Sequence, residues 1–501
     1  MSGKRMLRRV FLLLLSLMLL LTCFSSCGKV EKLQGETEAA QTDDEPIELW
    51  VLTDITMRDG MNGQARNAIK TFQSENDNVL INLEILPADA KERETRLEQL
   101  RVEILAGKGP DVYLMPTNNY LKLDYEGVVG RAYLLEPLFS DVEMTMHNGH
   151  FMDVSAYYDA DDELNKEGLI TKVMDAGVVG DARYILPLRY NFPVLYADTA
   201  RLAEFEVDQE RLCSGNIMDL MDLAIETGDQ MLAGGAVSVL EQRGLVLSLF
   251  SNVLDYEKGK VNLTQEDLCS FLTKLQQVRA LTKADYACYS SVYVEKYVRD
   301  KVSCSTRKYP IMQGILDETI AVIAVSKAAG DNITMIPLRA IDGSLVAHVT
   351  YYGAVGSSCE HPELAYNFLR MFLQEDMQWE YKRTTTNQTQ TFVDDGWPVR
   401  AVGAAEHLKA TCYRGLLREF IQREETKQRL TDVMQVEVTD EDVLDLLSVQ
   451  IDEVRFRIPL EWDLRDLTGS ISIEAGYPSD VDVNEVAEEM IYMLKYHLAE
   501  G

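Results

Sequence analysis

The chain has 501 residues, of which 46% are hydrophobic and 26% are charged, and its formal net charge is −32 at pH 7. This charge repels nucleic acid and anionic lipid head groups, so nucleic acid is excluded as a partner. About 450 folded residues are more than one hydrophobic core usually holds, which predicts a division into two lobes.

The first 26 residues have the layout of a signal peptide. Four basic residues between Lys4 and Arg9 precede an apolar run over residues 10–21. This run is too short to cross about 30 Å of hydrocarbon, which takes roughly 20 residues. Residues 24–28, FSSCG, resemble a lipobox, in which Cys27 becomes the lipidated first residue of the mature protein. An ordinary signal peptide cut near Ser26 is the alternative.

A flexible tether is predicted after the signal peptide. Residues 27–45 are polar and have no apolar periodicity. Cleavage after residue 26 removes four basic residues and changes the net charge from −32 to −36. Because anionic lipids repel such a chain, its attachment to the membrane would depend on acyl chains on Cys27.

The cysteines do not indicate a metal or redox site. None of the six that follow Cys27 is in a CxxC pair. Whether they pair as disulfides or remain thiols stays open. The six are Cys213, Cys269, Cys288, Cys304, Cys359 and Cys412.

Strands and helices alternate at the start of the folded part. Residues 47–52 and 79–85 show the alternation of half-buried strands, and residues 112–115 form a short apolar strand. Apolar residues at helical spacing predict helices over 65–72 and 97–104. Strand–helix–strand–helix–strand predicts a parallel sheet with right-handed crossovers.

The stretch 96–119 resembles a known signature. Gly107 can take the left-handed conformation that ends a helix, and Pro110 prevents a restart. A polar loop through Asn119 follows the strand, and ligands of open α/β sheets bind at such strand ends. The sequence from the helix through AGKGPDV to the strand resembles the family 1 extracellular solute-binding proteins, the receptors of bacterial ABC importers.

Later stretches resemble the same family in order. Residues 180–187 resemble its strand into the second lobe, and residues 335–355 its return to the first. Residues 361–369 resemble the helix that follows, and residues 484–498 the C-terminal helix. Between these stretches, helices are predicted over 217–228, 245–254 and 265–278, and a strand-rich segment over 314–325.

The resemblance covers residues 46–501 and implies an α/β, two-lobed type II periplasmic-binding-protein-like fold. This fold has a hinge and a ligand cleft between its lobes. Lobe one would comprise residues 46–155 and 335–385, and lobe two residues 156–334 and 386–501. Residues 401–470 match the family least and are the place for a family-variable insertion.

Two stretches deserve comparison with metal sites. Three acidic residues within 157–167 take the first, third and fifth positions of a calcium loop. Leu164 and Ile170 stand where such a loop needs Gly and a bidentate Glu, which favours a solvated surface loop. His147 and His150 have no helical pattern that would place them on one face. The sequence therefore predicts no metal and no cofactor.

Enzyme motifs are also missing from the sequence. There is no GxSxG, HExxH, P-loop or GxGxxG in the setting that each requires. Acidic residues are so abundant that a pair resembling a glycosidase dyad would be uninformative. We therefore expect a receptor and not an enzyme. A sensor or scaffold lipoprotein of the same fold without an importer is the alternative, and a surface glycoside hydrolase is the least favoured.

The resemblance places the binding site at four loops, with a tryptophan facing them from the second lobe. Polar side chains there can fork hydrogen bonds to neighbouring hydroxyls, and aromatic rings can cover a pyranose, so a sugar or oligosaccharide is the expected solute. The site residues are Thr53, Asp54, Asn118, Asn119, Arg189, Tyr190, Asn191, Tyr351, Tyr352 and Trp397.

Structural roles are open for several of these residues. Trp397 could fill the core, and Arg189 could neutralise a nearby carboxylate. Tyr351 and Tyr352 alternate across a strand, so at most one should face the ligand. The resemblance further implies a monomer on the outer face of the cell membrane, lipid-anchored through Cys27, whose partners are a small solute and the permease subunits of an ABC importer.

Overall fold

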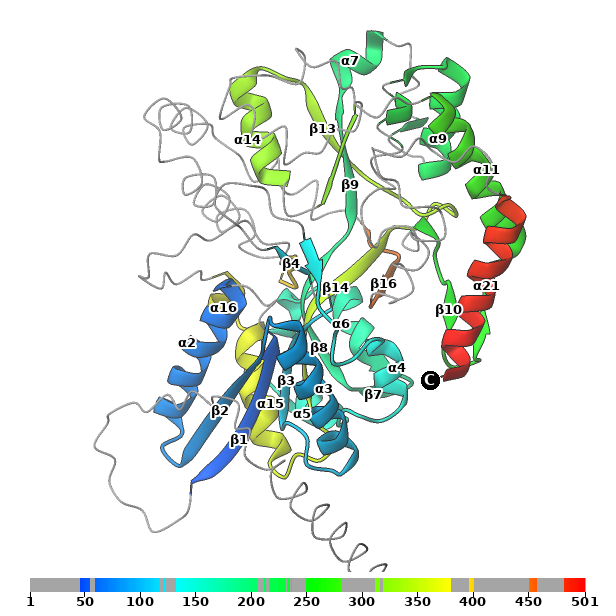
Figure 1. Ribbon diagram of the computed structural model, residues 1–501. Helices are drawn as coiled ribbons and strands as arrows, with labels where there is room; N and C mark the ends of the chain where they lie inside the picture. Colours follow the sequence, from blue (N-terminus) through cyan, green and yellow to red (C-terminus); the bar gives the residue numbers. More distant parts are fainter. Residues whose placement is uncertain are drawn as a thin grey trace, which may run out of the picture.

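The fold is described by a computed structural model, in which two sheets lie one above the other (Figure 1). The predicted signal peptide, tether and Cys27 lie outside the described residues, as does most of 401–470. Among the residues described, no helix is long and apolar enough to cross a membrane. The described residues are 46–54, 59–117, 120–122, 132–204, 211–212, 216–230, 232–234, 236, 249–281, 311–315, 319–379, 396–400, 450–456 and 482–500.

The main sheet has seven strands in the order β15-β8-β14-β3-β1-β2, with β16 also paired to β14. β1 pairs in parallel with β2 and β3, which confirms the predicted parallel arrangement. β14 runs antiparallel to both β3 and β8. The strands are β1 (Ile47–Asp54), β2 (Val79–Leu86), β3 (Val112–Pro116), β8 (Ile185–Asn191), β14 (Val346–Val355), β15 (Trp397–Pro398) and β16 (Glu453–Arg455).

Helices cover both faces of the main sheet. α2 (Asp59–Glu75) and α15 (Pro362–Arg370) share one core cluster with Leu49 and Val51 of β1. α3 (Ala90–Leu105) shares the cluster on the opposite face with Leu52. Successive strand residues point to opposite faces, so β1 is buried on both sides. Gly107, with φ of 67°, follows α3 in the left-handed conformation that the sequence predicted.

The second sheet has three strands in the order β12-β9-β13, all antiparallel neighbours. These strands are β12 (Ile311–Ile315), β9 (Pro193–Asp198) and β13 (Ile333–Pro337). α14 (Thr319–Ala329) shares a core cluster with Val194 and Tyr196 of β9. The alternate residues Leu195 and Ala197 belong to another cluster, so the two faces of β9 are covered by different helices.

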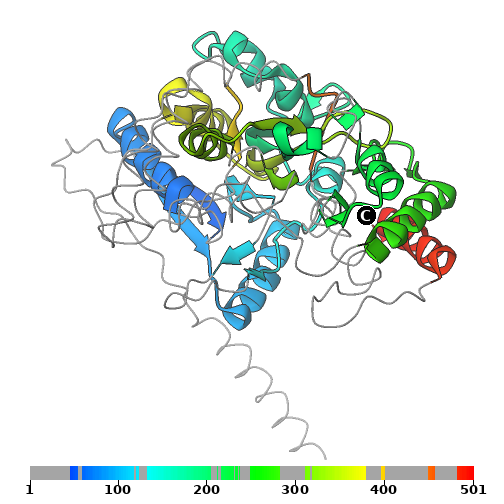
Figure 2. The ribbon, with the colours of Figure 1, turned by 90° about the horizontal axis from the view of Figure 1, so that it is seen from above.

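The helical cluster is our name for the core on that other face of β9. It is formed by α9 (Ile217–Thr227), α11 (Gln265–Leu281) and α21 (Val483–Glu500), together with Leu195 and Ile336 of the sheet. α21 lies along α11 in both ribbon views (Figures 1 and 2). The C-terminal helix is thereby part of the second core, although it is far from the others in sequence.

Short elements complete the described part. β4-β5, β6-β7 and β10-β11 form antiparallel pairs. The remaining elements are β4 (Tyr120–Lys122), β5 (Ala132–Leu134), β6 (Val178–Val179), β7 (Ala182–Arg183), β10 (Leu254–Asp255), β11 (Lys260–Val261), α4 (Val142–His147), α5 (Ser155–Ala160), α6 (Thr171–Met174), α7 (Thr199–Glu204), α16 (Glu375–Trp379) and the 3₁₀ turns Lys166–Gly168, Asp175–Gly177 and Met371–Leu373.

Within the described residues, the chain crosses between the two sheets twice. At the first crossing only Phe192 separates β8 from β9. At the second, residues 338–345 connect β13 to β14. The Leu338 amide donates to the Pro193 carbonyl at 3.0 Å, so the two crossings lie side by side.

Two predicted segments differ from the structure. Residues 314–325 were predicted to be rich in strand, but α14 begins at Thr319 and buries Val322 and Val325. A short apolar run does not by itself distinguish a buried strand from a buried helix. Residues 245–254 were predicted as a helix, but the described part, 249–254, contains no α-helix and ends at the start of β10.

The lobe boundaries stay a prediction. β8 and β15, which the sequence division assigned to lobe two, are strands of the main sheet because β8 pairs with β14 and β15 pairs with β8. We propose that lobe one continues to Phe192 and includes residues 396–400.

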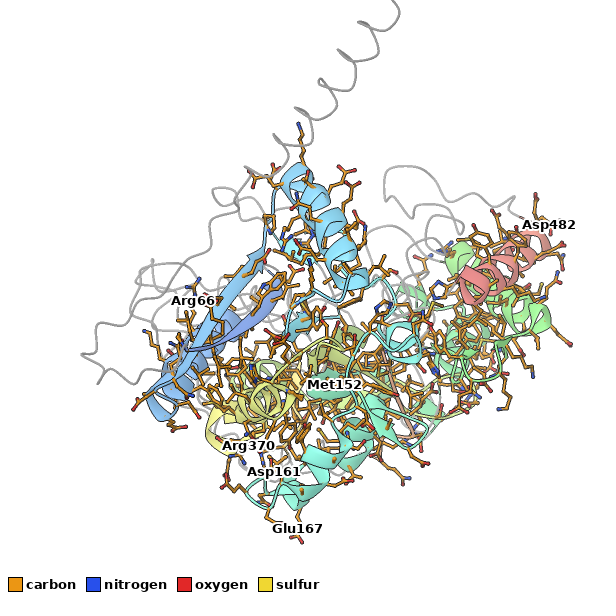
Figure 3. All side chains as sticks on the ribbon, turned by 90° about the horizontal axis from the view of Figure 1, so that it is seen from below. Arg66, Met152, Asp161, Glu167, Arg370 and Asp482 are labelled. Atoms are coloured by element: carbon orange, nitrogen blue, oxygen red, sulfur yellow. The ribbon has the colours of Figure 1, made fainter. Side chains whose placement is uncertain are left out.

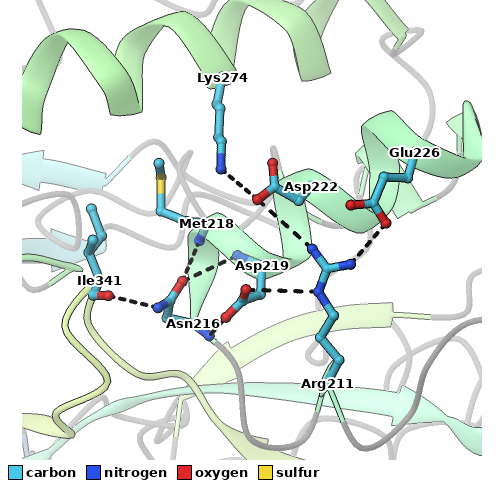
Figure 4. Close-up of polar contacts among 8 residues, drawn as sticks. All are labelled: Arg211, Asn216, Met218, Asp219, Asp222, Glu226, Lys274 and Ile341. Atoms are coloured by element: carbon cyan, nitrogen blue, oxygen red, sulfur yellow. Dashed lines mark hydrogen bonds and ion pairs between the residues drawn. The ribbon is translucent and has the colours of Figure 1, made fainter.

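Polar contacts at the start of α9 fix this helix in the second core (Figure 4). The Asn216 side chain accepts the amides of Met218 at 2.9 Å and Asp219 at 3.2 Å, and Asp219 accepts the Asn216 amide at 3.0 Å. Asn216 also donates to the Ile341 carbonyl at 2.8 Å, which ties α9 to the second crossing. Beside this cap, Arg211 lies 2.8 Å from Glu226 on the helix surface.

Replacement of Asn216 by Ala should lower the free energy of unfolding by about 1–2 kcal/mol, because it removes a capping box. Arg211→Ala is the control on the same helix surface and should cost less than about 1 kcal/mol, because its ion pairs are exposed. Urea unfolding of the full chain measures both. Equal losses for the two variants would contradict the capping role.

Candidate functional site

The predicted site residues on the main sheet lie in a row across neighbouring strands. Pro116 at the end of β3 pairs with Tyr351 of β14, and Tyr351 pairs in turn with Arg189 of β8. Tyr190 of β8 pairs with Trp397 of β15. The structure therefore brings four of the five predicted segments onto one sheet. They are 53–54 at the end of β1, 189–191 of β8, 351–352 of β14 and Trp397 of β15.

Asp54 is held by an ion pair that the sequence analysis missed. Arg93 of α3 donates from Nη2 to Oδ2 at 2.5 Å and from Nη1 to Oδ1 at 3.3 Å, and both side chains are almost fully buried. The same guanidinium donates to the carbonyls of Glu136 at 2.6 Å and Pro87 at 3.0 Å. Arg93 thus anchors the start of α3 to the end of β1. A buried arginine in a charged stretch gives no sequence signal, because Arg is usually exposed.

The two tyrosines of β14 lie on opposite faces of the sheet. Tyr351 belongs to the core cluster with α2 and α15, and Tyr352 to the cluster with α3. The Tyr352 ring lies 6.3 Å from the Phe151 ring and 6.0 Å from the Phe456 ring. Burial raises the pKa of Tyr352. It stays a prediction that at most one of the two tyrosines faces a ligand. Because Tyr352 packs among aromatic rings, Tyr351 is the better candidate.

The sequence analysis predicted that Trp397 would face the site from the second lobe. This prediction is wrong, because Trp397 lies in β15 of the main sheet. It is 2% exposed and belongs to the same core cluster as Tyr351. Gly396 makes this position possible, since it has φ of 78° and a Cβ there would lie 2.3 Å from Thr350 Oγ1. β15 is the last strand of the main sheet among the described residues, and the burial of Trp397 in the core cluster favours a core role over a role on the facing lobe.

Arg189 is held by a neighbouring main-chain group. Its Nη2 donates to the Gln378 carbonyl at 3.0 Å. The Gln378 side chain donates to the Leu188 carbonyl at 3.3 Å and accepts the Val399 amide at 2.9 Å. This buried glutamine of α16, which the sequence analysis also missed, therefore connects β8 with the residue after β15.

The loop after β3 is described only as far as Thr117, so Asn118 and Asn119 lie outside the described residues. The Thr117 amide donates to the Thr350 carbonyl at 2.9 Å, and Thr117 Oγ1 donates to the Val349 carbonyl at 2.5 Å. These bonds fasten the start of the loop to β14. Asn191, at the end of β8, accepts the Phe192 amide at 2.9 Å.

The described site residues are closed to solvent. Thr53 and Asp54 are 0% exposed, and the most exposed, Asn191, reaches 8%. Hydroxyl, amide, guanidinium and aromatic groups thus lie in a row across the sheet with almost no accessible surface in this arrangement. A solute could touch them only after neighbouring segments had moved.

The acidic stretch 157–167 is partly buried and was expected to be a solvated loop. Asp161 accepts the Tyr366 hydroxyl at 2.9 Å and Arg370 Nη1 at 3.0 Å. The labelled residues Asp161 and Arg370 lie close together in Figure 3. Arg370 also pairs with Glu163. These bonds tie the stretch to α15 through Asp161 and Glu163. Within the described ranges, no group of three or more His, Cys, Asp or Glu residues could hold a metal ion.

Two of the six cysteines that could form disulfides are described by the structure. Cys269 and Cys359, which belong to the described residues, are free thiols. Burial and the nearby Asp111 raise the pKa of Cys359 to about 12, so this thiol is unreactive at neutral pH. The other six cysteines lie outside the described residues.

Comparison with solved structures identifies the architecture. A periplasmic oligogalacturonide binding protein from Yersinia enterocolitica is 13% identical, matches 91% of this chain and 99% of its own, and gives a TM-score of 0.51. The chain has the fold of a periplasmic solute-binding protein. The predicted α/β fold of this class is thereby confirmed.

Two other solved structures are similar over the same share of the chain. A de novo designed cysteine esterase is 13% identical, matches 91% of this chain and 99% of its own, and gives a TM-score of 0.53. An extracellular solute-binding protein family 1 from Alicyclobacillus acidocaldarius is 13% identical over 91% of this chain and 100% of its own, with a TM-score of 0.49. No protein-family model matches the sequence, and comparison with curated proteins finds no match.

Replacement of Asp54 by Ala should lower the free energy of unfolding by about 3–5 kcal/mol, because Arg93 would be left buried without its carboxylate. Glu84→Ala is the matched control. Its partner Arg96 is 21% exposed and keeps Glu103 at 3.1 Å, so the loss should be about 1 kcal/mol or less. Chemical denaturation measures both free energies of unfolding. A loss for Asp54→Ala as small as that expected for Glu84→Ala would show that the Asp54–Arg93 pair does not stabilise the fold.

Proposed function

We propose that this protein is an extracellular, lipid-anchored solute-binding protein that captures a small solute and delivers it to an ABC importer. The observation that carries the proposal is the pair of sheets joined by two adjacent crossings, at Phe192 and at residues 338–345, in a chain with the fold of a periplasmic solute-binding protein. Two parts joined in this way can rotate about the crossings and enclose a ligand.

A sugar or oligosaccharide is the class of solute that we propose. The row of Arg189, Asn191 and Tyr351 supplies hydrogen-bonding groups beside aromatic rings, which suits neighbouring hydroxyls and the apolar face of a pyranose. The Yersinia protein is described as binding oligogalacturonide, which supports the general class without indicating the particular sugar.

Binding without catalysis is the favoured activity. The sequence lacks the enzyme motifs that were sought, and the esterase among the similar structures is described as a de novo design. A sensor or scaffold lipoprotein of the same fold would also bind a solute but would not support its uptake. Uptake of the labelled solute by cells with and without the protein distinguishes these two functions.

A thermal-shift screen with oligosaccharides, amino acids and peptides should identify a stabilising sugar. At a hundredfold excess over its Kd, the solute should raise the free energy of unfolding by about 2.7 kcal/mol. Tyr351→Phe should then weaken binding in calorimetry by about threefold to tenfold through loss of one hydroxyl bond. Tyr366→Phe, which removes the hydroxyl bonded to Asp161, is the control and should bind normally. Stabilisation by amino acids or peptides alone would overturn the sugar assignment.

The lipid anchor is a separate part of the proposal. Cys27→Ser should abolish incorporation of radioactive fatty acid and release the protein from the membrane fraction, because the strongly acidic chain has no attraction for anionic lipids. Cell fractionation and labelling of wild type and variant provide the measurement. Equal labelling of both would exclude Cys27 as the acylated residue.

A further inference from the structure

A buried carboxylate connects the main sheet with the helical cluster. Asp141 begins α4, where its Oδ1 accepts the Met144 amide at 2.9 Å. Its Oδ2 accepts the Tyr256 hydroxyl at 2.5 Å and lies 2.6 Å from Nε2 of His497 in α21. One side chain thus caps a helix and contacts two distant segments.

The partners of Asp141 belong to different cores. Val142 and Met146 of α4 pack in the cluster on the α3 face of the main sheet. Tyr256 packs against the helical cluster, and Leu494, three residues before His497, is buried in it. Figure 1 shows the end of α21 reaching down to α4. The contact therefore adds a side-chain connection between two cores that the chain also joins at the two crossings.

The contact between Asp141, Tyr256 and His497 is buried and well packed. The Asp141 side chain is 4% exposed and that of His497 is 14% exposed. The His147 ring of α4 stacks on Tyr256 at 5.8 Å with an interplanar angle of 27°. A buried carboxylate is costly unless its hydrogen bonds are made, so these bonds favour the present arrangement strongly over one that leaves Asp141 buried and unbonded.

Nearby bonds hold the same segment on the main sheet. Arg455 of β16 donates to the Phe250 carbonyl at 3.1 Å, and Glu453 accepts the Asn252 amide at 2.9 Å. β16 pairs with β14, so residues 250–256 rest against the edge of the main sheet while Tyr256 reaches Asp141. Rotation of the helical cluster about the crossings would have to stretch or break the bonds to Asp141 together with those of Phe250 and Asn252 to β16.

We propose that Asp141, Tyr256 and His497 form a latch that stabilises the present orientation of the helical cluster relative to the main sheet. The latch must open before the two parts can rotate. This inference goes beyond solute binding and does not depend on the identity of a solute, because it concerns the protein without ligand.

Two variants test the latch without removing other functions of its residues. Tyr256→Phe removes the hydroxyl and keeps the ring that stacks on His147. Asp141→Asn keeps an oxygen that can cap α4, because Asn is as good a cap as Asp, and removes the charge that faces His497. Tyr366→Phe is the control, since it breaks a tyrosine–aspartate bond of 2.9 Å on the main-sheet side alone.

The experiment is small-angle scattering and amide hydrogen exchange on the full chain without solute. Both latch variants should shift the pair-distance distribution, and exchange in the last turns of α21 should become about threefold to tenfold faster. Tyr366→Phe should leave the distribution unchanged. Faster exchange with a scattering profile identical to wild type would mean that the contact is only a local structural bond and would overturn the proposal. Because no solute is used, either result is independent of the screen for ligands.

Discussion

The double pairing of β14 is the constraint on which the architecture depends. One edge of this strand bonds to β3 and the other to β8, and its first residues also pair with β16. Segments that are more than 200 residues apart in sequence, Val112–Pro116 and Val346–Val355, become neighbours in this way. The antiparallel strand also extends to the second crossing. Both the row of site residues and the connection to the second sheet therefore result from the same hydrogen-bond ladders.

Several side chains of the candidate site already form bonds or packing contacts that stabilise the fold in the present arrangement. Asp54 is bonded to Arg93, Tyr352 lies among aromatic rings, and Trp397 fills space beside β8. Such residues can still touch a solute, but their replacement changes stability as well as affinity. A loss of binding in a variant of this row can be assigned to the solute only when the free energy of unfolding of the unliganded variant has been measured.

The sequence was informative where periodicity is strong and burial simple. The alternation in 47–52 and 79–85 and the Gly107 stop correspond to β1, β2 and the end of α3. Residues 314–325 were misassigned because an apolar run suits either a helix or a strand. The side of the molecule occupied by Trp397 depends on its pairing with Tyr190, a long-range contact that leaves no local signal. The partners of Asp54 were hidden for the same reason.

The two crossings differ in stiffness. Phe192 precedes Pro193, whose ring fixes its own φ and keeps the preceding residue extended, so the shorter crossing has little torsional freedom. The longer crossing contains Gly343, with φ of 88°, and spans several residues that can share a change in torsion angles. The hinge axis of any rotation should therefore pass close to Phe192. The longer segment, residues 338–345, would then bend to follow the movement, and its length and torsional freedom would limit the angle through which the two parts can rotate.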